Sequence, residues 1–145
     1  MEYIVEQLLN LDDLIAYLND VDSDFGVPLS NKVTITSFAE KLLINGKVFI
    51  VKKNNKIASC IGFYCNDIIN YTAHLPILST KEWARGNGFA RILIKKMFEE
   101  CERYKMKNIL CDSVNPQAIA LYKSLGFVEY KKEDNKSFLR FFKKI

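Results

Sequence analysis

The chain has 145 residues, 49% of them hydrophobic and 26% charged, a balance that predicts one globular domain over residues 1–145. No apolar stretch approaches the 18 or so residues of a membrane helix, which excludes a transmembrane protein. The 21 basic and 17 acidic residues leave a formal net charge of +4, which suits an anionic small ligand better than a nucleic-acid groove.

The first fifty residues predict a strand, two helices and a loop. Polar and apolar residues alternate in EYIVEQ, which indicates a short strand over residues 2–7. Asn10 is a candidate N-cap for a helix in NLDDLIAYLNDV. Gly26 and Pro28 mark DFGVPLSNK as a loop, and a second helix in TSFAEKLLINGK should end at Gly46.

Three strand-like runs follow, in KVFIVKK, KIASCIGFYC and IINYTAHLPILST, the last of which covers residues 68–80. Asn54 and Asn55 separate the first two runs, and asparagine tolerates the left-handed geometry of a hairpin turn. The three runs therefore predict an antiparallel meander.

The second half predicts helices alternating with strands. Apolar residues recur at helical spacing within WARGNGFARILIKKMFEECERY, which indicates a helix over about 88–105. A strand in KNILCDSV precedes a helix in NPQAIALYKSLG, with Pro116 in its first turn and Gly126 past its end. Two strands, FVEYKK and SFLRFFKK, close the chain. The strand–helix–strand order implies a parallel pairing within a mostly antiparallel sheet.

The four cysteines, at positions 60, 65, 101 and 111, form no CxxC pair, and there is one histidine. We therefore expect neither a metal site nor a disulfide framework, and we interpret Cys60 and Cys111 as buried apolar residues in a reducing compartment. Residues 1–9 carry two glutamates and no basic start, which predicts no targeting leader and a cytoplasmic location.

The stretch before the long helix is a candidate anion site. The first N–H groups of a helix lack internal partners, and the helix dipole adds positive charge there. Gly86 and Gly88 let a phosphate approach the backbone, and Arg85 and Arg91 add charge. A dinucleotide-binding GxGxxG would need glycine at position 91, and the GK[ST] of a P-loop is absent.

A second cluster supports this interpretation. The sequence RGNGFA, residues 85–90, resembles the Q/R-x-x-G-x-G/A acyl-CoA signature of the GNAT superfamily of N-acetyltransferases. The N-x-x-A-x-x-x-Y-x-x-x-G-F signature that follows it in that family is similar to Asn115, Ala118, Tyr122, Gly126 and Phe127. The seven-residue step from Asn115 to Tyr122 returns to nearly the same helix face.

The resemblance implies an α/β fold with a mixed, mostly antiparallel sheet of about six or seven strands and about four helices. Acetyl-CoA would lie between two splayed parallel strands, near 72–80 and 108–114. No metal is implied. The residues that the resemblance assigns to the cofactor are Leu78, Ser79, Thr80, Arg85, Gly86, Asn87, Gly88, Phe89, Ala90, Asn115, Ala118 and Tyr122.

The resemblance also implies direct attack of an amine on the thioester in a ternary complex. Tyr122 would act as the general acid, since a tyrosine with a pKa near 10 can donate to a departing thiolate. Asn115 would contact the CoA arm. For the general base, His74, Glu82 and bulk water stay open. Regular alternation would place His74 on one face with Thr72, Pro76, Leu78 and Thr80.

The chain departs from the family where Thr80, Lys81 and Glu82 replace an apolar residue and a proline, so we expect an early strand end or a bulge there. By position, FGVPLS should line the acceptor pocket. Asp20, Asp22 and Asp24 precede it, and they either attract a cationic amine or form a solvated helix end.

The expected function is therefore acetyl-CoA-dependent acetylation of a small-molecule primary amine, such as an amino sugar or an amino acid derivative. The alternatives are a protein or peptide amine, and acyl-CoA binding without turnover. We expect no nucleic-acid or membrane partner, and a monomer or homodimer. A nucleic-acid platform would need exposed aromatics, whereas SFLRFFKK alternates like a core strand.

Overall fold

The computed structural model describes residues 2–142. Its strands are β1 Ile4–Gln7, β2 Lys47–Lys53, β3 Lys56–Asp67, β4 Thr72–Thr80, β5 Asn108–Ser113, β6 Val128–Glu133 and β7 Lys136–Phe142. Its α-helices are α1 Leu11–Val21, α2 Ile35–Asn45, α3 Phe89–Arg103 and α4 Pro116–Ser124. Short 3-10 turns lie between α1 and α2 and before α3.

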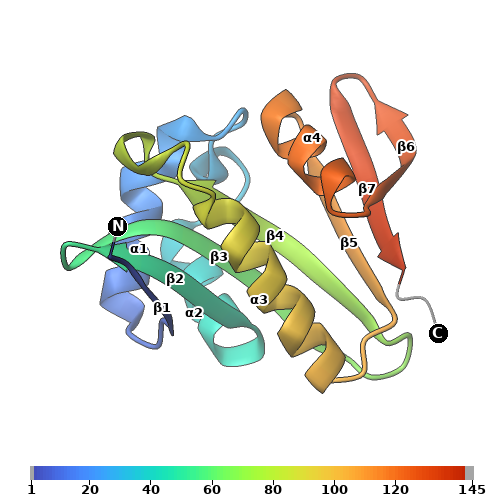
Figure 1. Ribbon diagram of the computed structural model, residues 1–145, viewed down its shortest axis with the longest axis horizontal. Coiled ribbons are helices and arrows are strands. Elements are labelled where there is room, and N and C mark those ends of the chain that lie inside the picture. The colour runs from blue at the N-terminus through green and yellow to red at the C-terminus, as the bar shows by residue number, and fades with distance from the viewer. Residues whose placement is uncertain (1, 143–145) are drawn as a thin grey trace.

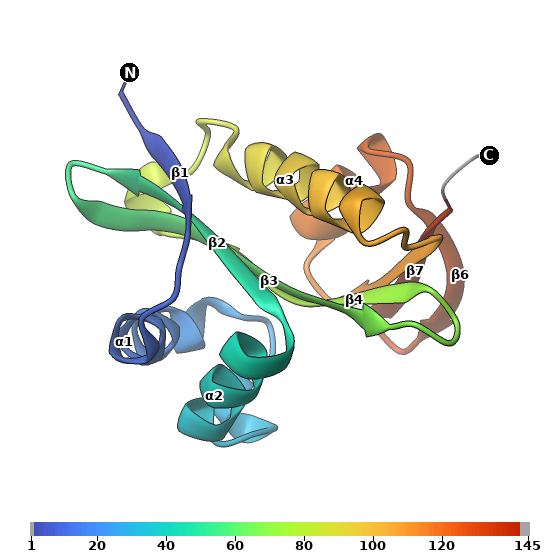
Figure 2. The same ribbon diagram turned by 90° about the horizontal axis from the view of Figure 1, so that it is seen from below.

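The seven strands form one sheet in the order β1-β2-β3-β4-β5-β7-β6 (Figure 1). All neighbours are antiparallel except β4 and β5, which run parallel. Figure 2 shows α1 and α2 on one face of the sheet and α3 and α4 on the other. The expected mixed, mostly antiparallel α/β fold with one parallel pair is confirmed.

Several caps and turns form where the sequence predicts them. The Asn10 side chain accepts a hydrogen bond from the Asp13 N–H at 2.9 Å and caps α1. Asn54 and Asn55 both have positive φ in the β2–β3 turn. Gly126 follows α4 with a φ of 104°, a conformation that favours glycine. These elements are therefore fixed by interactions between residues close in sequence.

The strand predicted over residues 68–80 is shorter at its start. β4 begins at Thr72, and Ile68 and Ile69 are exposed in the preceding turn. The Asp67 carboxylate accepts the N–H groups of Ile69 and Asn70 and so holds this turn. Apolar composition alone cannot distinguish such a turn from a strand.

The irregularity expected near Thr80 lies elsewhere. β4 stays in regular register with β3 from Ile77 to Thr80, so the prediction of an early end or a bulge there was wrong. Instead Ile77 pairs with Gly62 while His74 pairs with Tyr64, which gives β4 one extra residue in between. Proline lacks an N–H and is found in such bulges, and Pro76 falls within this one.

The bulge changes which face each β4 residue occupies. Before it, Leu75 belongs to the apolar cluster beneath α3; after it, Ile77 belongs to the cluster beneath α1 and α2. A regular strand would keep both on one face. His74 therefore lies on the same face as Ile77 and Ser79, and the predicted face shared with Leu78 and Thr80 was wrong.

Candidate active site

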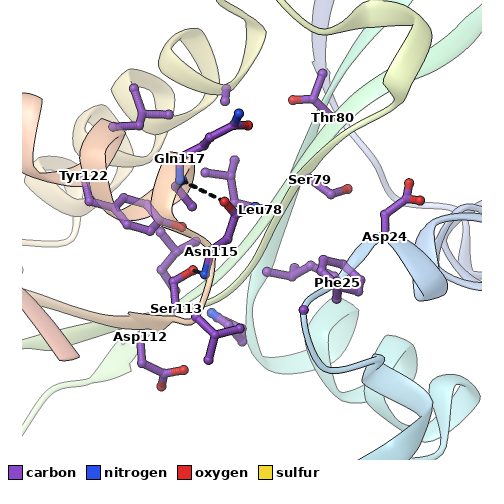
Figure 3. A pocket seen from close by; sticks show the side chains of 18 of the residues that line it. Asp24, Phe25, Leu78, Ser79, Thr80, Asp112, Ser113, Asn115, Gln117 and Tyr122 are labelled. Atoms are coloured by element: carbon purple, nitrogen blue, oxygen red, sulfur yellow. Dashed lines mark hydrogen bonds between the residues drawn. The ribbon is translucent and has the colours of Figure 1, made fainter. Parts of the chain in front are cut away.

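A cavity of about 650 Å³ opens where β4 and β5 separate (Figure 3). The parallel pairing runs from Thr72 with Asn108 to Leu75 with Cys111. Beyond it, the strands diverge on either side of the cavity. The wall comes from β4, the β4–α3 connection, the start of α3, the end of β5, the β5–α4 connection, α4, β7 and the α1–α2 connection.

One edge of β4 faces this cavity. From Ile77 to Thr80 the strand pairs with β3, and within residues 2–142 it has no partner strand on its other side. Backbone groups of a strand alternate between its two edges, so part of the β4 backbone is directed at the cavity. Leu78, Ser79 and Thr80, which the resemblance assigns to the cofactor, line the cavity.

The glycine loop meets the cavity at the start of α3. Gly88 is the N-cap of α3 with a φ of 77°, and Gly86 has a φ of 82°. A Cβ built on either glycine would meet no atom within 4 Å. Among the hydrogen bonds of the described residues, none uses the N–H groups of residues 86–91 as donors. These groups and the dipole of a 15-residue helix have the chemistry to bind an anion.

The arginines of this loop are partly engaged within the protein. Arg85 donates from Nε to the Thr80 carbonyl at 3.2 Å, and its Nη2 lies 3.8 Å from the Asp24 carboxylate. Arg91 donates to the Ser124 hydroxyl at 3.3 Å and so links α3 to α4. Both residues line the cavity.

The remaining predicted loop residues divide into two groups. Phe89 and Ala90 line the cavity. Asn87 does not, and its side chain donates to the Ala84 carbonyl at 2.9 Å. The Asn87 side chain therefore shapes the loop.

Tyr122 combines a buried ring with a hydroxyl directed at the cavity. The residue is 5% exposed, and its ring packs 5.4 Å from that of Phe127, centroid to centroid. Figure 3 shows the hydroxyl pointing from α4 into the space beside Leu78 and Asn115. Burial, with smaller contributions from Cys111 and Asp112, raises the pKa of Tyr122 well above its usual value. The hydroxyl therefore stays protonated throughout the neutral range.

Asn115 and Ala118 line the cavity beside Tyr122. The Asn115 side-chain oxygen accepts from the N–H groups of Gln117 and Ala118 at 2.9 and 3.4 Å, so it caps α4. The backbone N–H of Asn115 donates to the Ser113 hydroxyl at 3.0 Å. Capping occupies the carbonyl oxygen and leaves the amide nitrogen of Asn115 for a ligand.

A hydroxyl network that the sequence analysis missed supports the β4 wall. The hydroxyls of Tyr17 and Ser79 hydrogen-bond at 2.7 Å, and Ser59 donates to the Ser79 carbonyl at 2.8 Å. Ser59 and Thr80 hydroxyls also hydrogen-bond at 2.8 Å. Tyr17 falls among the apolar residues of α1, and a buried tyrosine usually has a hydroxyl partner, which was the available signal.

The α1–α2 connection lines the side of the cavity opposite Tyr122 (Figure 3). Asp24, Phe25 and Val27 contribute side chains there. A Cβ on Gly26 would collide with the Val114 side chain, so the loop backbone touches the β5–α4 connection. This contact narrows the opening between the two halves of the sheet.

The three aspartates near this loop differ in position. Asp24 lines the cavity, whereas Asp20 forms an ion pair with Lys81. Asp22 accepts hydrogen bonds from the hydroxyl and backbone N–H of Ser30, which lower its pKa. Asp112, which the sequence analysis missed, also lines the cavity and lies 3.4 Å from the Lys136 amine.

Neither of the two candidate general bases, His74 and Glu82, lines the cavity. His74 is exposed on β4, before the strands diverge, and does not line the cavity. Glu82 is exposed in the turn before α3 and does not line it either. The structure therefore brings Tyr122, the glycine loop and β4 together, but not His74 or Glu82.

No group of three or more His, Cys, Asp or Glu residues within the described range could hold a metal ion. None of the helices in residues 2–142 has the length and apolar character needed to cross a bilayer.

Comparisons with known proteins agree with this geometry. The family model described as Acetyltransferase (GNAT) family matches residues 14–127. No curated protein sequence matches the chain significantly.

Solved structures share the fold at low identity. An acetyltransferase of the GNAT family from Staphylococcus aureus Mu50 superimposes with a TM-score of 0.80 at 16% identity, covering 97% of this chain and 99% of that one. The ribosomal-protein-S18-alanine N-acetyltransferase from Escherichia coli gives 0.76 at 19% identity, covering 97% and 93%. The PaiA N-acetyltransferase from Thermoplasma acidophilum, in complex with coenzyme A, gives 0.76 at 14% identity, covering 99% and 100%.

Proposed function

We propose that this chain, which belongs to the GNAT family of acetyltransferases, transfers the acetyl group of acetyl-CoA to a primary amine of a small molecule. The observation that carries the proposal is the set of N–H groups between Gly86 and Ala90, which are unused within residues 2–142. They open on a cavity that continues along β4 to Tyr122.

The same residues fit the acyl donor. A pyrophosphate at the head of α3 would accept hydrogen bonds from the loop amides, and Arg91 lies close enough in the wall to add charge. From Ile77 to Thr80 the cavity edge of β4 has no partner strand within residues 2–142, and it can pair with the amides of the pantetheine arm as one more strand would, although the Thr80 carbonyl already accepts from Arg85. The Asn115 amide nitrogen can donate to the same arm.

Chemistry at the thioester needs a neutral amine, a stabilised oxyanion and a protonated leaving group. The nitrogen–carbon bond forms and the carbon–sulfur bond breaks, and the Tyr122 hydroxyl donates its proton to the departing thiolate. Neither His74 nor Glu82 lines the cavity, so in our proposal solvent water takes up the proton that the attacking amine loses. Water then restores the proton of Tyr122.

The acceptor side favours a small amine. The backbone at Gly26 touches Val114, and the preceding residue, Phe25, lines the cavity. An extended peptide lying across the site would have to displace this contact. The Asp24 carboxylate can attract a cationic group of the acceptor. It already lies 3.8 Å from Nη2 of Arg85, which partly neutralises its charge.

A peptide amine is the second candidate acceptor. The Escherichia coli structure of this fold is named for acetylation of an alanine of ribosomal protein S18. Another solved structure that matches, at 18% identity, is titled as the NatC complex bound to a Gag peptide and CoA. A peptide N-terminus could enter end-on through the opening that a small amine would use.

Two measurements on the purified protein test the proposal. Calorimetry with acetyl-CoA should show saturable binding, and a thiol-release assay with amino sugars, amino acids, polyamines and short peptides should show CoA release with a small amine. The absence of acetyl-CoA binding would contradict the proposal as a whole. Release with peptides alone would establish the second candidate, and binding without any release would support an acyl-CoA-binding protein.

A further inference from the structure

Two of the four cysteine thiols meet in the folded chain. Cys65 lies near the end of β3 and Cys101 in the last turns of α3, and their Sγ atoms are 3.6 Å apart. A disulfide needs a sulfur–sulfur distance of about 2.05 Å, so the two sulfur atoms would have to approach by roughly 1.5 Å. The pair forms where α3 packs on β3, on the face away from α1 and α2.

The two thiols differ in exposure and charge. Cys65 is partly exposed, whereas Cys101 is 4% exposed. The hydrogen bond from Cys101, helped by the positive charge of Lys47, lowers the pKa of Cys65 against the opposing effects of burial and Glu100. The same hydrogen bond, together with burial, raises the pKa of Cys101. Cys65 is therefore the more acidic thiol of the pair.

The other cysteines lack these features. Cys60 is fully buried, beneath α1 and α2, and Cys111 is 6% exposed in β5. Burial raises the pKa of both thiols to about 12. Because Cys60 and Cys111 are also free thiols but lack a thiol neighbour in the described residues, they serve as internal controls.

We propose that Cys65 and Cys101 form a reversible disulfide site that a hydroperoxide oxidises. The Cys65 thiolate attacks one peroxide oxygen, the oxygen–oxygen bond breaks, and Cys65 becomes a sulfenic acid while hydroxide takes up a proton. The Cys101 sulfur then attacks the Cys65 sulfur, and water leaves with the Cys101 proton. In total, two thiols and hydrogen peroxide give one disulfide and two waters.

The disulfide would close a loop of the chain that contains elements of the proposed active site. The segment between residues 65 and 101 contains all of β4, the glycine loop and most of α3. A crosslink across a loop of this length restricts the unfolded chain, so the melting temperature should rise by roughly 5–10 °C on oxidation and fall back on reduction.

The experiment treats the native protein with stoichiometric hydrogen peroxide, followed by alkylation under denaturing conditions and mass spectrometry. The expected result is the loss of two alkylatable thiols and a mass decrease of about 2 Da before alkylation, since two hydrogens leave. Proteolysis should yield one crosslinked peptide pair joining Cys65 to Cys101, and dithiothreitol should restore four thiols.

Matched variants decide the assignment. Cys60→Ser and Cys111→Ser should each still form the crosslink, whereas Cys65→Ser and Cys101→Ser should each abolish it. In Cys101→Ser, Cys65 should instead be trapped as a sulfenic acid by dimedone. Four free thiols after peroxide treatment, a crosslink through Cys60 or Cys111, or a bond between two chains would each overturn the proposal, whether or not the protein acetylates amines.

Discussion

The side chain of Tyr122 combines a buried ring with a hydroxyl that stays protonated at neutral pH. Its ring is held in the core beside Phe127, while its hydroxyl faces the cavity. Burial disfavours the phenolate, so the pKa is raised and the hydroxyl remains a donor at neutral pH. A departing thiolate could draw on this donor without any neighbouring base.

Tyr122→Phe should lower kcat by about 10²-fold, because it removes a proton donor from the reaction and keeps the ring in the core. Affinity for acetyl-CoA should change by less than about 3-fold, since most of the donor contacts in our proposal are to the backbone. Steady-state kinetics and calorimetry measure the two quantities separately. Raising the pH from 7 to 9 should not lower wild-type kcat through Tyr122, because its raised pKa keeps it protonated.

Tyr130→Phe is the matched control, since Tyr130 is 53% exposed on β6 and does not line the cavity. This variant should match the wild-type kcat. If Tyr122→Phe weakened acetyl-CoA binding as much as it lowered kcat, Tyr122 would be a binding residue and the acid role would be contradicted.

At the scale of elements, the start of α3 depends on glycine for two separate reasons. Positive φ at Gly86 and Gly88 gives the chain the left-handed turns that lead into the helix head, a conformation that favours glycine. The open space around both Cβ positions leaves room for a ligand against the backbone. A side chain at Gly88 would therefore strain the loop and fill the ligand space.

Gly88→Leu should abolish measurable acetyl-CoA binding by calorimetry, because the side chain would project into the space assigned to the pyrophosphate. Gly88→Ala carries the same backbone strain of about 1–2 kcal/mol with only a methyl group. It should therefore show a similar loss of stability in thermal unfolding but retain more affinity than the leucine variant. Wild-type affinity in Gly88→Leu would show that the pyrophosphate lies elsewhere.

The β4 bulge is the element that the sequence analysis could not place. Pro76 is visible in the sequence, but a proline is compatible with an edge strand, a strand start or a bulge. Only the pairing of β4 with β3 shows the extra residue. It rotates Ser79 toward Tyr17 and His74 away from Leu78, so it decides which β4 side chains share a face.

At the scale of the whole molecule, the cavity lies in the middle of the sheet. The order β1-β2-β3-β4-β5-β7-β6 puts the parallel pair between an N-terminal and a C-terminal set of strands (Figure 1). Within residues 2–142, ladder pairing joins the two sets only between Thr72–Leu75 and Asn108–Cys111. A ligand between the diverging strands would contact both sets and link them.

Acetyl-CoA should therefore stabilise the folded chain as a unit. At a concentration 100 times its Kd, mass action contributes about 2.7 kcal/mol, which corresponds to a rise in Tm of roughly 6–12 °C. Differential scanning fluorimetry over an acetyl-CoA titration measures this shift. Gly88→Leu should show no shift under the same conditions, and a wild-type Tm independent of acetyl-CoA would contradict the proposed cavity occupant.

The sequence by itself determined the features that depend on near neighbours. The Asn10 cap, the Asn54–Asn55 turn and the Gly126 terminus involve contacts within a few residues, and hydrophobic periodicity places α3 and β5. The glycine loop and the Asn115–Tyr122 helix were also recognisable, because their signatures are local. Together they were sufficient for the family and for the mixed sheet.

The tertiary structure decided what depends on packing between distant segments. Tyr17 meets Ser79 across 62 residues, Gly26 meets Val114 across the cavity, and Cys65 meets Cys101 across 36 residues. The bulge at Pro76 sets the face of His74 through pairing with another strand. Side-chain direction and burial, which control acidity and access, arise only when these segments pack together, and no local pattern encodes them.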